Sequence, residues 1–165
     1  MYKTGQYNLI FKHIRSCAIS QDNEVQYNLY LSHNPKSNAT EVKGNITTSI
    51  QLDDTLFLEL NFAMKDADGH WKENTYIHKS PNACSSFRNL MGTEWTKIMN
   101  GLGVKKATCP IPPGIYTTPG LDTSIFLNIN RPKTFIYETY KIRFFFSRFK
   151  GVYGCTIFVI EFKPL

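Results

Sequence analysis

Two aromatic-rich runs near the C-terminus show the clearest pattern of the chain. Side chains two positions apart in a β-strand point to the same face of the sheet. In the run 140–147, large apolar residues recur at every second position: Tyr140, Ile142, Phe144 and Phe146. The run 154–162 is apolar on both faces, which is typical of a strand covered on two sides. We predict a β-hairpin with its turn at 148–151 and an unusual surplus of rings on one face.

Alternation also predicts strands earlier in the chain. The strand 56–64 shows the cleanest alternation, and the sequence Asp66-Ala67-Asp68-Gly69 after it predicts a hairpin turn. The register of 41–51 places Val42, Ile46 and Ile50 inward and Asn45 outward. A polar turn is expected at 21–24 and a loop at 32–39. The predicted strands in this part of the chain are 7–15, 25–31, 41–51, 56–64 and 71–79.

The periodicity becomes helical after residue 80. Apolar residues at helical spacing predict a helix over 81–102, with Ser80 as N-cap and Pro81 in the first turn. Gly92-Thr93 is expected to divide it into two short helices, and Gly101 and Gly103 to end it. The apolar face consists of Phe87, Leu90, Met91, Trp95, Ile98, Met99 and Leu102.

The segment between this helix and the C-terminal hairpin is less regular. A stiff proline-rich loop is predicted at 109–114, a short strand begins at Ile115-Tyr116, and Pro119-Gly120 is expected to be a turn. A further strand or irregular edge is predicted at 124–129. With no repeat or linker visible, these elements predict a single domain, 1–165, that is mainly antiparallel β with one helical insertion, either a sandwich or an open barrel.

Composition narrows the classes of partner. The chain of 165 residues has a net charge of +6, with its Lys and Arg residues scattered and no run of five like charges. A nucleic-acid-binding protein would show a basic stripe or a known motif, so no nucleic acid is expected. A mildly basic surface is compatible with an anionic membrane. The chain contains no stretch of 18 apolar residues, so no transmembrane helix is predicted.

Cysteines and sequons bear on the cellular compartment. Met1 leads directly into polar residues, so no signal peptide is visible; an intracellular chain and a mature secreted chain carrying an added Met are the alternatives. The cysteines, Cys17, Cys84, Cys109 and Cys155, form no C-x-x-C pair and suggest a two-disulfide framework. Asn38 and Asn45 begin N-glycosylation sequons. These features favour an extracellular, oxidising setting.

No catalytic or metal motif emerges. The four histidines lack metal spacing, and neither a nucleophile elbow nor a phosphate-binding loop is present. The carboxylate pairs Asp53/Asp54 and Asp66/Asp68 lie in predicted turns, where Asp bonds to the local backbone. His78 is expected to be a surface or satisfied histidine. We therefore expect no enzyme activity, no cofactor and no metal site.

The apolar faces allow two interpretations. They either fill a solid core or line a hollow between two sheets, closed at one end by the helix. Periodicity does not separate these alternatives. The candidate cavity residues are Leu58, Leu60, Phe62, Phe87, Met91, Trp95, Met99, Tyr140, Ile142, Phe144, Phe146, Ile157 and Val159.

The order of features along the chain is distinctive: a first strand with a cysteine, a long β-meander and a last strand with Cys155. Its most specific element is Cys109-Pro110-Ile111-Pro112-Pro113-Gly114-Ile115-Tyr116, with Cys84 about 25 residues earlier at the head of a helix. In these features the chain resembles the ML lipid-recognition family, in particular its arthropod branch. Members of that family are secreted β-cups, formed by two antiparallel sheets around an apolar pocket, and they do no covalent chemistry.

The resemblance implies a disulfide pairing and a ligand class. It pairs Cys17 with Cys155 and Cys84 with Cys109. It implies a secreted carrier of a fatty acid, phospholipid, glycolipid or other apolar small molecule, with a membrane surface or receptor as a further partner and chemosensory proteins among its relatives. Lys97, Lys105 and Lys106 are either simple solvated lysines or contacts for an anionic headgroup. The rival functions are an extracellular accessory protein of a receptor or channel, and an enzyme with an unrecognised site.

Overall fold

A computed structural model describes residues 2–17, 24–149 and 151–165. The first strands are β1 (Thr4–Gly5), β2 (Tyr7–Ser16), β3 (Val25–Asn34), β4 (Ala39–Thr48), β5 (Phe57–Lys65) and β6 (Trp71–Ser80). The helical segment consists of α1 (Ala83–Met91), the 3₁₀ turn η1 (Gly92–Glu94) and α2 (Trp95–Gly101). The last elements are β7 (Gly114–Asp122), η2 (Thr123–Asn128), β8 (Phe135–Ile136), β9 (Thr139–Arg148) and β10 (Gly151–Pro164).

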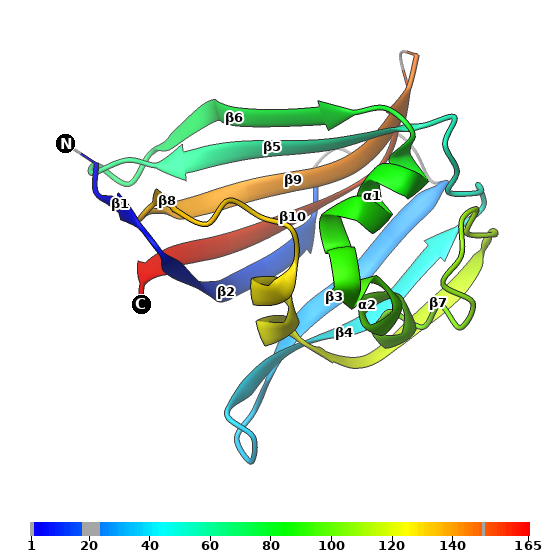
Figure 1. The fold of residues 1–165 in the computed structure, drawn as a ribbon, viewed down its shortest axis with the longest axis horizontal. Helices are drawn as coiled ribbons and strands as arrows, with labels where there is room; N and C mark the ends of the chain where they lie inside the picture. The colour runs from blue at the N-terminus through cyan, green and yellow to red at the C-terminus, as the bar shows by residue number, and fades with distance from the viewer. Residues whose placement is uncertain (1, 18–23, 150) are drawn as a thin grey trace.

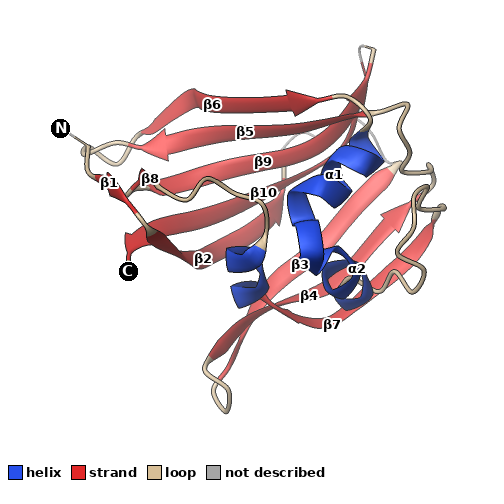
Figure 2. Ribbon diagram, in the orientation of Figure 1, coloured by secondary structure: helices blue, strands red, loops and turns tan. Residues whose placement is uncertain are grey.

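The strands form antiparallel sheets of two different sizes that face each other. The larger sheet has the order β2-β10-β9-β5-β6, and the smaller sheet has the order β3-β4-β7. A short pair, β1 with β8, lies at the end that holds both termini (Figure 1). Strands dominate, and the helices lie on one side, between the two sheets (Figure 2). The predicted mainly β, two-sheet fold with one helical insertion is confirmed.

The sheets approach each other along β2 and β3 and diverge toward β6 and β7. At the close side, Ser16 Oγ donates a 2.9 Å hydrogen bond to the carbonyl of Tyr27. Cys17 on this side forms a disulfide with Cys155, and Cys84 forms one with Cys109, so the predicted pairing is confirmed. Disulfides are typical of extracellular proteins. No helix within the described ranges is long and apolar enough to span a membrane.

The helical segment holds the diverging side open. At its start, Ala83 N–H donates to the carbonyl of Leu56 just before β5. At its end, Gly103 adopts φ 92° and packs against the backbone of Thr117 in β7, so that a Cβ atom there would lie 2.4 Å from the Thr117 oxygen. Only glycine tolerates both that conformation and that approach. The segment therefore reaches from the large sheet to the small one.

The start of the helix differs from the prediction. The helix begins at Ala83, not at Pro81, and its N-cap is Asn82, whose side chain makes no capping bond. The carboxylate of Asp54 caps the first turn instead, accepting bonds from Ser85 N–H at 2.8 Å and Ser85 Oγ at 2.6 Å. These bonds lower the pKa of Asp54. The cap comes from 31 residues upstream, which a local sequence pattern does not reveal. The predicted division at Gly92-Thr93 is confirmed by η1.

The irregular region differs in two further places. Pro119-Gly120 does not form a turn but lies inside β7, where the pairing with β4 shifts register between Val42 and Gly44. An edge strand with a bulge tolerates proline because no ladder hydrogen bond is lost. The segment 124–129, predicted as a strand or irregular edge, is mostly the 3₁₀ helix η2, in which Asp122 accepts a hydrogen bond from Ser124 N–H and caps the helix. Of the turn predicted at 21–24, residues 21–23 lie outside the described residues.

Candidate functional site

A cavity of about 720 Å³ lies between the two sheets. This volume falls within the range of about 300–1,000 Å³ found for small-molecule sites. Its lining is apolar over most of its area and comes from both sheets, the helical segment and the stretch after η2. The predicted internal apolar cavity is therefore present in the fold.

The larger sheet forms one wall. Leu60 and Phe62 of β5 lie beside Ile142, Phe144 and Phe146 of β9, whose alternation matches the predicted face. From β10 the lining residues are Thr156, Phe158, Ile160 and Phe162.

The smaller sheet and the helices form the other wall. Val42 and Ile46 of β4, followed by Ile50, face the cavity, which confirms the predicted register. Opposite them, the helical segment contributes its apolar face. The lining residues of β3 and the helices are Val25, Tyr27, Leu29, Phe87, Leu90, Met91, Ile98 and Met99.

The structure brings most of the predicted cavity residues together. Eight predicted residues line the cavity: Leu60, Phe62, Phe87, Met91, Met99, Ile142, Phe144 and Phe146. Five others do not: Leu58, Trp95, Tyr140, Ile157 and Val159. Each of the five has an identifiable reason, either a covering neighbour or the wrong face of a strand.

Covering neighbours explain the first three. Leu58 is fully buried beneath the start of α1, in a cluster with Ala83 and Phe146. The indole of Trp95 donates to the carbonyl of Ala107 at 2.8 Å and is packed within the helical layer. Tyr140 faces inward but is enclosed by other rings, with its ring centroid 4.9 Å from that of Phe162.

Strand parity explains the last two. β10 turns Thr156, Phe158 and Phe162 toward the cavity, so Ile157 and Val159 lie on its opposite face. The run is apolar on both faces, and the sequence therefore carried no signal that distinguishes the two.

The numerous aromatic rings both fill part of the core and line part of the cavity. At the end near the termini, Tyr7, Phe135, Tyr140 and Phe162 pack as an aromatic cluster, with the Tyr7 and Phe162 centroids 4.8 Å apart. Tyr7, Phe135 and Phe162 of this cluster also border the cavity. Toward the helices, Phe144 meets Phe87 at 5.4 Å but also borders the cavity. The hollow thus lies between two packed ends.

Polar groups are few in the lining. The phenol of Tyr27 lies in the wall, and burial raises its pKa well above the usual range. It is therefore uncharged at any physiological pH. The other polar lining side chains include Thr48, Thr156, His78, Asn130, Arg131 and Lys133.

Sequence reasoning missed the charged part of the lining. Arg131 and Lys133 follow η2, in a region without periodicity, and His78 was predicted only as a surface or satisfied residue. By contrast, Lys97, Lys105 and Lys106 are exposed and lie outside the cavity lining, as simple solvated lysines do.

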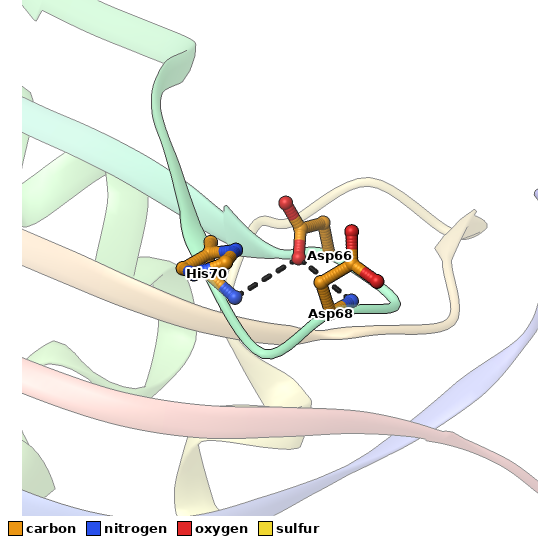
Figure 3. A group of neighbouring side chains, drawn as sticks. All are labelled: Asp66, Asp68 and His70. Atoms are coloured by element: carbon orange, nitrogen blue, oxygen red, sulfur yellow. Dashed lines mark hydrogen bonds between the residues drawn. The ribbon is translucent and has the colours of Figure 1, made fainter.

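Asp66, Asp68 and His70 gather at the β5–β6 turn (Figure 3). Their potential ligand atoms lie within 4.8 Å of one another. However, Asp66 Oδ1 already accepts hydrogen bonds from the backbone N–H groups of Asp68 and His70, both at 2.9 Å. This local bonding is the ordinary function of Asp in a turn, as the sequence predicted.

The two sequon asparagines differ in environment. Asn38 is exposed in the β3–β4 turn, with φ 54°. Asn45 lies on the outer face of β4, half-buried, and its side-chain oxygen accepts a 3.0 Å hydrogen bond from Asn28 Nδ2. Both therefore face away from the cavity, but only Asn38 projects freely.

A matched pair of leucines tests whether the hollow exists. Leu58→Ala should lower the free energy of unfolding by about 4 kcal/mol, because Leu58 is packed on all sides. Leu60→Ala, on the same face of the same strand, should cost about 2 kcal/mol, since Leu60 borders empty space and has fewer packing partners to lose. Urea unfolding of both variants measures the difference. Equal losses would mean that Leu60 is packed as tightly as Leu58.

Comparison with known proteins adds no assignment. A scan against protein-family models found no match. A search of curated proteins found no significantly similar sequence. The cavity and its lining are therefore the basis for the functional proposal.

Proposed function

We propose that the protein is a secreted, non-enzymatic binder of lipids or lipid-like apolar small molecules, held between its two sheets. The observation that carries this proposal is the apolar cavity of about 720 Å³. Close-packed proteins rarely keep a space of this size without a ligand to occupy it. The resemblance of the chain to the ML family, with its β-cup, supports the same conclusion.

The composition of the lining suits capture and release of an apolar ligand. Aromatic rings offer large apolar contact areas, and flexible methionines such as Met91 and Met99 adapt to ligands of different shape. Burial of apolar ligand surface contributes about 25 cal/mol per Å² before the costs of association. Such a carrier would capture and release its ligand without bond chemistry.

A second candidate function has one observation in its favour. On β6, which among the described strands pairs with β5 alone, Tyr76 is 46% and Ile77 57% exposed. Apolar side chains on a free sheet edge favour contact with another protein. An extracellular accessory protein of a receptor or channel would use this edge and need no ligand.

Blocking the cavity tests the binding proposal. Ile46→Trp places a larger side chain in the hollow and should weaken binding of the neutral fluorescent probe N-phenyl-1-naphthylamine at least about tenfold. Thr47→Trp adds the same ring to the opposite face of β4 and is the matched control. Fluorescence titration gives the affinities, and urea unfolding shows that both variants fold. Binding that is absent in the unmodified protein, or unaffected by Ile46→Trp, would favour the accessory function.

Secretion has its own test. The two disulfides and the sequons support passage through the secretory pathway. Expressed with a signal peptide in animal cells, the protein should reach the medium with a glycosidase-sensitive mass increase. Asn38→Gln should remove most of that increase and Asn45→Gln little, because only Asn38 projects freely. Retention of the unmodified protein inside the cell would contradict secretion.

A further inference from the structure

Apart from the tyrosines, all titratable side chains that line the cavity are basic. They are Arg131, Lys133 and His78, and no Asp or Glu of the described residues lines the cavity. An apolar pocket of neutral character needs none of these groups. Their presence on one cavity, without an acid, indicates a preference for negative charge in the ligand.

Arg131 is held in place by neutral groups. Its Nε donates to the carbonyl of Leu127 at 2.9 Å, and its guanidinium carbon lies 4.7 Å from the ring centroid of Tyr7. Tyr7 is itself fixed by a 2.7 Å hydrogen bond from its hydroxyl to the carbonyl of Pro132. These contacts orient the guanidinium but leave its charge uncompensated.

No described carboxylate neutralises Arg131 or Lys133. The ion pairs in the described part of the chain join Lys12 to Glu161, and Lys141 and Arg143 to Glu73. A guanidinium has five N–H donors. Arg131 uses Nε on Leu127 and reaches Pro132 only with a long 3.5 Å contact from Nη1. Most of its donors therefore remain for solvent or for a ligand in the cavity.

Arg131 and Lys133 lie two residues apart in the stretch between η2 and β8, and both line the cavity. Lys133 is exposed, whereas Arg131 is partly buried. His78 lines the cavity from β6, which is the opposite edge strand of the large sheet from β2, whose Tyr7 contacts Arg131. The stretch between η2 and β8 thus presents positive charge to the cavity.

We infer that the cavity selects anionic amphiphiles, with the head group at Arg131 and Lys133 and the tail among the apolar walls. This inference rests on the proposed binding function. Carboxylate and phosphate both match the planar donor geometry of a guanidinium. In apolar surroundings such charge-assisted bonds are stronger than in water. Arg131 is thereby a specificity-determining residue rather than only a support for η2.

Three ligands with the same tail test this inference. Dodecanoate, dodecyl phosphate and 1-dodecanol are used below their aggregation limits at pH 7.4, to displace N-phenyl-1-naphthylamine from the protein. At least one anion should bind about tenfold more tightly than the alcohol. The stronger of the two anions identifies the head group as carboxylate or phosphate.

Variants assign the preference to Arg131. Arg131→Gln should bring the affinity for the anion to that for 1-dodecanol and leave the alcohol itself within about twofold. Arg15→Gln, at an exposed position outside the cavity, is the matched control and should keep the preference. Lys133→Gln, which changes an exposed lining residue without disturbing packing, should reduce the preference about twofold to threefold.

The outcomes separate the two claims. Equal binding of anions and alcohol, or an anion preference that survives both Arg131→Gln and Lys133→Gln, overturns the inference and leaves the proposed function standing. Failure of all three ligands and of the probe to bind contradicts the proposed function itself. Loss of alcohol and anion binding together in Arg131→Gln would show that Arg131 has only a structural role.

Discussion

The fold depends on a helical segment wedged between two sheets that would otherwise close on each other. α1 is anchored to the large sheet through the Ala83 N–H bond to the carbonyl of Leu56, and the end of α2 packs on β7 through Gly103. The Cys84–Cys109 disulfide ties the start of the wedge to the loop before β7. Cys84 is fully buried within the main core, so this covalent link is embedded among packed side chains. The cavity follows from the separation that the wedge imposes.

The cavity lies between two packed regions of different composition. At the terminal end, rings from Tyr7, Phe135 and Phe162 pack against one another and border the cavity. At the other end, the helices supply Met91, Trp95 and Ile98 as a second core. Between these ends the side chains of Leu60 and Ile142 have apolar neighbours on the sheet and empty space above. An apolar ligand would restore the missing contacts, which is the physical reason for a binding function.

The regular strands and the helix could be predicted from periodicity, since alternation at Ile142, Phe144 and Phe146 reports directly on which face is inward. Features that depend on distant partners could not. Asp54 caps a helix that begins about 30 residues later, and Pro119-Gly120 becomes a bulge only because β4 lies beside it. The face of β10 that lines the cavity could not be predicted either, because the strand is apolar on both faces. The basic residue Arg131 lacked any local signal, since its neighbours come from β2 and η2.

Diffraction from crystals pressurised with xenon tests the central claim most directly, because xenon enters apolar cavities without needing a specific head group. The account predicts anomalous density between the two sheets, in contact with Leu60, Ile142 and Phe144. The account would be contradicted if these side chains were in direct contact with those of Val42 and Ile46 and no xenon lay among them.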